Sequence, residues 1–223
     1  MGELIVLKDW HRERTQVVAG TLPAFFFDPS CPFSYLAAER VERMLGEVHW
    51  VPTAAGSLHE SGPQLHVPLH DALSRDPLEQ TRIVMARAEH QALMLRLPLV
   101  WPDRFPAGSP AALRVAAHAA EVGAGAWFAL AAARLAFCGG FDLEDRSVLA
   151  DAARAAELDV DEALAAAANP ALDGPIHSTA RGLRAHGIRS LPAIRVGRQL
   201  ISGERMLEEA APPPRPSRRP AAG

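Results

Sequence analysis

Short apolar runs and longer stretches of helical periodicity alternate along the chain, and they mark its elements. The apolar run Ala24–Phe27 is stopped by Asp28-Pro29-Ser30 and predicts a buried strand. Val48–Val51 predicts a second strand, which ends at a proline. Apolar residues at helical spacing predict a helix from about Pro32 to Leu45 between them. The chain therefore opens as strand, helix, strand.

The middle of the chain is helical in pattern. Helical spacing covers Pro77–Leu97, and alanine-rich stretches follow a proline-rich connection. Alanine has the highest helix propensity, so these stretches predict helices at about 110–122, 125–138, 144–156 and 160–168. Trp127, Phe128 and Phe137 recur at helical spacing and are expected to lie in the core.

The last part returns to strand signals. A helix after Pro175 precedes the strand Ala193–Val196, a turn, the return strand Gln199–Ser202, and a final helix within Glu204–Ala210. The first and last parts can share one sheet, which predicts an α/β fold with a helical block inserted in it. The sections are a polar extension 1–22, sheet-forming halves 23–76 and 176–210, a helical insertion 77–175 and a disordered tail 211–223.

Composition and charge exclude several classes of protein. Hydrophobic residues make up 48% and the net charge is −3, which is typical neither of disorder nor of a basic nucleic-acid binder. No apolar run is long enough to span a membrane, so a membrane partner is not expected either. Met1–Gln16 shows no signal-peptide pattern, so we expect a cytoplasmic protein whose thiols stay reduced.

Candidate metal ligands are few. His59, His66 and His70 lie close together in the sequence, but Pro63 and Pro68 argue against the helix that would bring the last two into register. We therefore expect no metal site and no permanently bound cofactor. Small side chains on the alanine-rich helices allow close packing, so a homodimer is a further possibility.

One cysteine occupies a position suited to chemistry. Cys31-Pro32-Phe33-Ser34 lies where a predicted strand ends and a helix begins. Free backbone N–H groups and the helix dipole favour an anion there, which predicts a thiol pKa below that of free cysteine. Pro32 suits the first helical turn. The alternative interpretation of Cys31 is a small buried apolar residue.

The segment Phe27–Ala37 resembles the opening motif of the DsbA-like thioredoxin superfamily. It is most similar to the cytoplasmic branch of FrnE-type oxidoreductases, 2-hydroxychromene-2-carboxylate isomerases and kappa-class glutathione transferases. Leu97–Pro102, Gly187–Gly197 and Gly203–Leu207 resemble later segments of the same family, in the same order. The resemblance implies a thioredoxin fold with an inserted all-helical domain.

The resemblance also implies a ligand site. It implies that Pro192 follows a cis peptide bond and that the backbone of Leu191 turns toward the thiol to bind glutathione or an extended peptide. Pro32, Phe33 and Ser190 are implied as neighbouring binding residues. Glutathione, or another thiol or disulfide, is then the cosubstrate.

Cys31 and Ser34 are the catalytic candidates. The redox branch of the family carries C-x-x-C, and the isomerase branch carries serine first, so this chain matches neither fully. Ser34 cannot form a disulfide, and Cys138 in the helical block is a poor substitute. The leading hypothesis is therefore mixed-disulfide chemistry at one cysteine, resolved by glutathione, with Ser34 donating to the thiolate. The alternatives are a glutathione-dependent isomerase or transferase and a non-catalytic peptide-binding module.

Overall fold

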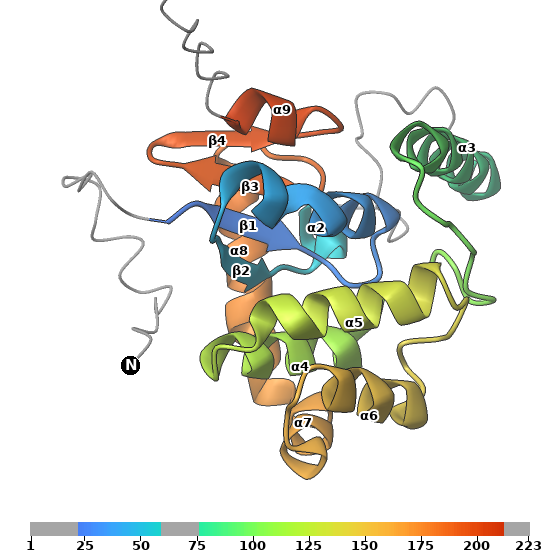
Figure 1. The fold of residues 1–223 in the computed structure, drawn as a ribbon, viewed down its shortest axis with the longest axis vertical. Coiled ribbons are helices and arrows are strands. Elements are labelled where there is room, and N and C mark those ends of the chain that lie inside the picture. The colour runs from blue at the N-terminus through green and yellow to red at the C-terminus, as the bar shows by residue number, and fades with distance from the viewer. Residues whose placement is uncertain (1–21, 59–75, 212–223) are drawn as a thin grey trace, which may run out of the picture.

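The computed structural model describes residues 22–58 and 76–211. The predicted N-terminal extension up to residue 21, the C-terminal tail from residue 212 and the three histidines at 59, 66 and 70 lie outside the described residues. Figure 1 shows a small sheet with helices against it, and a group of helices, α4 to α7, beyond one of its edges.

The sheet has four strands in the order β2-β1-β3-β4. Its strands are β1 (Ala24–Phe27), β2 (His49–Pro52), β3 (Ala193–Val196) and β4 (Gln199–Ser202). β1 pairs in parallel with β2 and antiparallel with β3, and β3 pairs antiparallel with β4. The two sequence-distant halves of the chain therefore meet at the β1–β3 pairing, as the strand pattern predicts.

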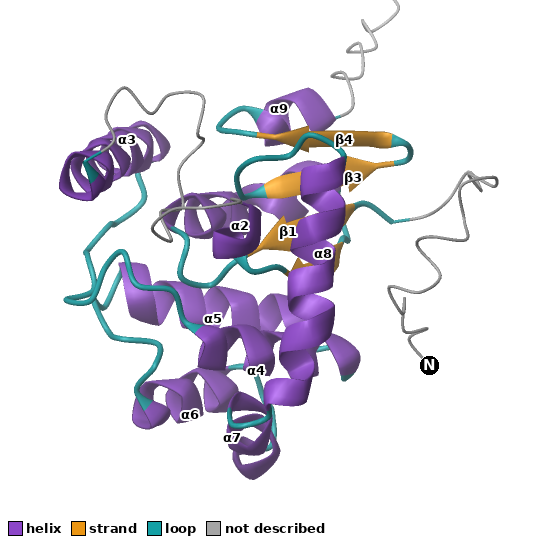
Figure 2. Ribbon diagram, turned by 180° about the vertical axis from the view of Figure 1, so that it is seen from behind, coloured by secondary structure: helices purple, strands orange, loops and turns teal. Residues whose placement is uncertain are grey.

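The two faces of the sheet are covered by different helices. Phe25 and Phe27 pack in one apolar cluster with residues of α2 (Pro32–Leu45) and α9 (Met206–Ala210). Phe26 points the other way and packs in a second cluster with residues of α8 (Asp173–Ala185). This alternation is the period of two that a strand imposes on its side chains. Figure 2 shows α8 crossing in front of the sheet with α2 behind it.

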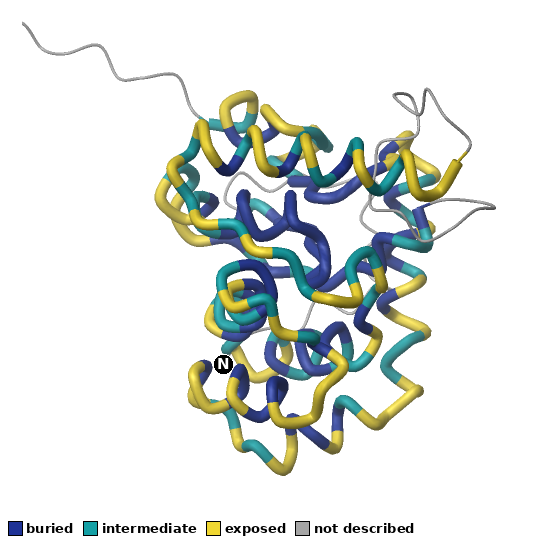
Figure 3. Tube along the Cα trace, turned by 90° about the vertical axis from the view of Figure 1, so that its right-hand side faces the viewer, coloured by how far each residue is buried: buried dark blue, intermediate teal, exposed yellow. Residues whose placement is uncertain are grey.

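The helical segment between β2 and α8 follows the alanine-rich pattern closely. It comprises α3 (Pro77–Leu95), α4 (Pro110–Glu121), α5 (Gly125–Phe137), α6 (Arg146–Ala155) and α7 (Val160–Ala167), with short 3₁₀ turns η1 (Ala55–Leu58) and η3 (Pro170–Leu172) on either side. Buried positions concentrate where these helices face the sheet and one another (Figure 3). Side chains of Asp76, Ser109, Asp145 and Asp159 accept hydrogen bonds from the first turns of α3, α4, α6 and α7.

Two details differ from the sequence prediction. Trp127 is 68% exposed, whereas Phe128 and Phe137 are buried, so the expectation of a core tryptophan is wrong. Trp127 lies in the first turn of α5. Helix α8 begins at Asp173, because Pro175 fits the first turn of a helix, where its missing N–H is not needed. Among the described residues, no helix is both long and apolar enough to cross a membrane.

Candidate functional site

Cys31 lies at the junction of β1 and α2. It is the N-cap residue of α2, in extended backbone conformation, and Pro32 occupies the first turn. The backbone N–H of Cys31 donates to the carbonyl oxygen of Asp28 at 3.0 Å, which closes the turn between strand and helix. The side chain is fully buried, with no exposed surface.

The second chain segment at the site is the loop before β3. The Leu191–Pro192 peptide bond is cis. The Sγ of Cys31 lies 3.8 Å from the carbonyl oxygen of Leu191, the length of a weak thiol hydrogen bond. Two residues that are 160 positions apart are thus brought together, as the family resemblance implies.

A buried polar network supports the turn that carries the thiol. Asp28 is buried, and its carboxylate accepts from the N–H and hydroxyl of Ser30 at 2.9 and 2.7 Å and from the N–H of Ala55 at 3.0 Å. Ser34 accepts from the N–H of Asp28 at 3.2 Å. The sequence pattern indicates only that Asp28 ends the first strand. It does not predict the hydrogen bond by which Asp28 connects the end of β1 to the start of η1.

The ionisation of Cys31 differs from the sequence expectation. Burial raises the pKa of the Cys31 thiol from its ordinary 9.0 to about 12. Hydrogen bonds from the Ser34 hydroxyl and from the backbone of Ser34 and Phe33 lower this pKa by less, and the charge of Asp28 raises it further. The predicted low pKa is therefore wrong for this arrangement, because desolvation outweighs the helix N-terminus. At neutral pH the buried thiol carries its proton.

Residues from elements distant in sequence share a buried cluster with Cys31. They include Val84 and Ala88 of α3 and Leu58 of η1. Only Val84, Ala88 and Ala92 of the α3 residues are buried. Figures 1 and 2 show α3 on the flank of the molecule, apart from α4 to α7. Helix α3 therefore contributes few buried side chains to the cluster that contains the thiol.

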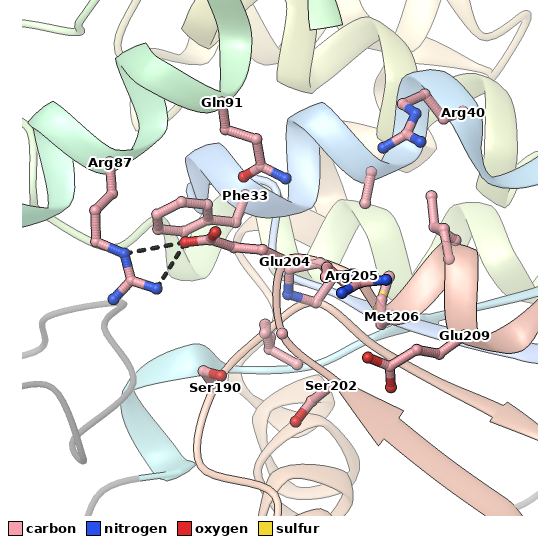
Figure 4. A pocket seen from close by; sticks show the side chains of 15 residues that line it. Phe33, Arg40, Arg87, Gln91, Ser190, Ser202, Glu204, Arg205, Met206 and Glu209 are labelled. Carbon is pink, nitrogen blue, oxygen red and sulfur yellow. Dashed lines mark hydrogen bonds and ion pairs between the residues drawn. The ribbon is translucent and has the colours of Figure 1, made fainter. Parts of the chain in front are cut away.

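A cavity of about 300 Å³ lies next to the Leu191–Pro192 loop that contacts the thiol. Phe33, Ser190, Leu191 and Pro192 are on its wall, so four of the five residues expected to bind a ligand line one space. Pro32, Cys31 and Ser34 are buried and do not line the cavity. The remaining wall comes from α2, α3, the end of β4 with the loop after it, and α9, with the side chains shown in Figure 4. This volume is at the lower end of the range for small-molecule sites.

The cavity wall carries charges of both signs. Arg87 donates to the carboxylate of Glu204 through Nε at 3.0 Å and Nη2 at 2.6 Å, which links α3 to the loop after β4 (Figure 4). Arg40 is paired with Glu208 of α9. Arg205 and Glu209 line the cavity and form no ion pair within residues 22–58 and 76–211. No sequence pattern marks this set, because α2, α3 and the segment from Glu204 to Glu209 are far apart along the chain.

Cys138 has a different environment. It caps the C-terminus of α5, and its Sγ lies 3.2 Å from the hydroxyl oxygen of Tyr35. Tyr35 donates to the carbonyl oxygen of Pro98 at 2.9 Å, so the single hydroxyl proton is used and the Cys138 thiol is the donor to Tyr35. Burial and the contact with Cys138 raise the pKa of Tyr35. Both cysteines are free thiols.

Within the described ranges 22–58 and 76–211, no group of three or more His, Cys, Asp or Glu side chains could hold a metal ion.

Comparison with known structures places the fold. The chain is similar to 2-hydroxychromene-2-carboxylate isomerase, with 16% identity over 84% of this chain and 93% of that one and a TM-score of 0.67. It is similar to a probable DsbA oxidoreductase from Streptomyces coelicolor, with 22% identity over 84% and 86% and a TM-score of 0.65. The cytosolic disulfide reductase DsbM from Pseudomonas aeruginosa has 19% identity over 84% and 92%, with a TM-score of 0.57. These likenesses show a shared thioredoxin fold with helical insertion.

Sequence comparison gives the family. No curated protein sequence matches the chain. The model of the DSBA-like thioredoxin domain matches residues 24–211, from β1 to the end of α9. The chain belongs to the DsbA-like thioredoxin family.

Proposed function

We propose that this protein is a thiol oxidoreductase that acts through Cys31 alone and exchanges disulfides with glutathione. The observation that carries the proposal is the contact of the Cys31 thiol with the carbonyl of Leu191, a residue that itself lines the cavity together with Phe33 and Pro192. DsbM, a fold neighbour, has been solved with glutathione. Arg205 and Glu209 put charges of both signs on the wall, which suits a ligand that carries both charges, as glutathione does.

The exchange requires two thiol attacks. Cys31 releases its proton to water, and its thiolate attacks the glutathione sulfur of a mixed disulfide between glutathione and a substrate thiol. The S–S bond breaks, a Cys31–glutathione disulfide forms, and the departing substrate thiolate takes up a proton. A free glutathione thiolate then attacks the glutathione sulfur on Cys31, which releases the Cys31 thiolate to take up a proton and forms glutathione disulfide, so the substrate is reduced and glutathione is oxidised. Ser34 has no sulfur, so an external thiol is needed for this step. Glutathione disulfide itself can replace the substrate disulfide in the first step.

Access to Cys31 is part of the proposal. The thiolate forms only when Sγ becomes solvated, because burial is the main cause of its high pKa. Ligand entry that moves Phe33 or α3 would expose Sγ at the N-terminus of α2, where the dipole favours an anion. We further propose a cytoplasmic setting, where reduced glutathione is the abundant thiol.

Intact mass after incubation with glutathione disulfide tests the proposal. We expect one glutathione adduct on the wild type and on Cys138→Ser, and none on Cys31→Ser. Cys138→Ser is the matched control, because it removes the other free thiol. Absence of an adduct on the wild type, or an adduct that survives in Cys31→Ser, would contradict single-cysteine chemistry at Cys31.

A non-catalytic binding module is the second candidate, and the complete burial of Cys31 favours it. This alternative predicts that iodoacetamide fails to label Cys31 in the folded protein, with or without glutathione. It also predicts that a non-reactive analogue such as S-methylglutathione still stabilises the protein against heat. Labelling of Cys31 that increases when the analogue is present would rule it out.

A further inference from the structure

Gln91 is a polar residue on the wall of the cavity with an unused acceptor. It projects from α3 toward the space bounded by Phe33 and Glu204 (Figure 4). Its Oε1 is buried and has no hydrogen-bond partner within the described residues. Every other buried side-chain oxygen or nitrogen in residues 22–58 and 76–211 has one. A desolvated amide oxygen without a hydrogen-bond donor destabilises a protein. We therefore expect Oε1 to accept a hydrogen bond from a molecule that enters the cavity.

The position of Gln91 relates it to the thiol. Val84, Ala88 and Gln91 are spaced by four and three residues, so they share one face of α3. Val84 and Ala88 belong to the buried cluster that contains Cys31. A ligand that reaches Gln91 therefore lies against the same face of α3 that packs in this cluster.

The surroundings of Gln91 define the donor it fits. Glu204 is already neutralised by Arg87, and Glu209 comes from α9 on the other side of the cavity (Figure 4). An ammonium ion next to Gln91 would have no free carboxylate beside it. A neutral N–H, such as that of a peptide bond, satisfies Oε1 without burying a charge.

We propose that Gln91 is a specificity-determining residue that accepts a hydrogen bond from a peptide N–H of the thiol ligand. The inference rests on the proposed function and adds a ligand class, because the site then prefers peptide-like thiols such as glutathione over simple alkyl thiols. Gln91 contacts the ligand away from the reacting sulfur.

The test compares two disulfides on one variant. Gln91→Met keeps the length of the side chain and removes the amide. We expect the rate of mixed-disulfide formation at Cys31 with glutathione disulfide to fall about 3- to 10-fold, the effect of one hydrogen bond. The rate with 2-hydroxyethyl disulfide, which has no amide, should not change. Gln80→Met on the same helix does not alter the cavity wall and should leave both rates as in the wild type.

Thermal unfolding provides the second measurement. Without ligand, Gln91→Met should melt at the same temperature as the wild type or higher, because an unpartnered buried oxygen has been removed. The upward shift of melting temperature given by S-methylglutathione should become smaller in the variant. A lower melting temperature without ligand would indicate a structural role and overturn the inference.

The outcomes separate the inference from the proposed function. Equal slowing with both disulfides, or no slowing with glutathione disulfide because water satisfies Oε1, would overturn the role of Gln91. If the wild type forms no adduct with either disulfide, the thiol chemistry fails. Binding of S-methylglutathione then tests the role of Gln91. A smaller rise in melting temperature in Gln91→Met than in the wild type supports that role, and an equal rise overturns it.

Discussion

Cys31 precedes helix α2, and two of the helices that pack against α2, namely α5 and α3, do so very differently. Against α5, Tyr35 stacks on Phe137 with ring centroids 5.8 Å apart, within a cluster that includes Phe128, Ala132 and Ala136. Against α3, the buried residues are small, and Leu93 and Met94 of the same helix are 74% and 70% exposed. The α5 side therefore fixes where α2 lies. The α3 side has little apolar burial, so we expect access to Cys31 to be easiest there.

The largest effect should follow from breaking the α5 side. Phe137→Ala removes a buried aromatic ring and should lower the free energy of unfolding by about 3–5 kcal/mol. The matched change on the α3 side, Val84→Ala, removes two methyl groups and should cost about 2 kcal/mol or less. Urea unfolding followed by circular dichroism measures both.

The same pair of variants separates stability from access. Val84→Ala should accelerate iodoacetamide labelling of Cys31 under native conditions, because it removes two methyl groups from the buried cluster that contains Cys31. Phe137→Ala should leave the labelling rate of the folded fraction unchanged. Equal stability losses, or faster labelling only in Phe137→Ala, would contradict the contrast between the two sides.

Alkaline pH should reveal the burial of Cys31 through stability. The folded pKa is about 12, above the ordinary 9.0, so the folded state keeps a proton that the unfolded state loses first. Stability from this group is complete below about pH 9 and declines as pH rises toward 12. Between pH 8 and 10 the wild type should lose on the order of 1 kcal/mol more than Cys31→Ser in urea unfolding.

A control for the alkaline effect is available in the second cysteine. Cys138→Ser should keep the alkaline decline of the wild type, since Cys31 remains. Tyr35, whose pKa is also raised, keeps its partner Cys138 in the wild type and in Cys31→Ser, so its contribution cancels in that comparison; Cys138→Ser alters this contact and serves only to show that the decline persists while Cys31 is present. Parallel pH profiles for the wild type and Cys31→Ser would show that the thiol is solvated in solution.

The smallest stability effect should come from the ion pair that ties α3 to the loop after β4. Arg87 and Glu204 are partly exposed, so Glu204→Gln should cost about 1 kcal/mol at most. It should nevertheless accelerate labelling of Cys31, because α3 loses its link to that loop. Glu39→Gln breaks the corresponding pair with Arg134 of α5 and should change stability similarly without changing the labelling rate. A faster rate in both variants would point to general loosening.

The sequence predicts the positions of strands and helices, because these depend on residues that are close together along the chain. The apolar runs locate β1, β3 and β4, and the alanine content locates α4 to α7, because strand and helix periodicity are local properties. The site pairing of Cys31 with Leu191 came through resemblance to a family. Trp127 could not be placed, because spacing tells which residues share a helix face and not where that helix leaves the core.

The failures at the site have a common cause. The predicted low pKa of Cys31 rested on the helix N-terminus, which is adjacent in sequence. The burial that raises the pKa involves a cluster with residues of other elements, among them Val84 and Ala88, and the sequence does not show this cluster. Gln91 was missed for the same reason. Its spacing from Val84 and Ala88 was visible, but only the fold shows that this face meets a cavity.

The order β2-β1-β3-β4 has a consequence for synthesis of the protein. β1 is central in the sheet, yet one of its two partners, β3, is made after the entire helical segment. At translation rates of about 5–20 residues per second, the interval is roughly 10 to 30 s. During that time Leu191 has not been made, so β1 lacks its antiparallel partner β3 and Cys31 lacks its contact with that carbonyl. A nascent chain therefore presents this thiol to cellular oxidants before the finished fold hides it.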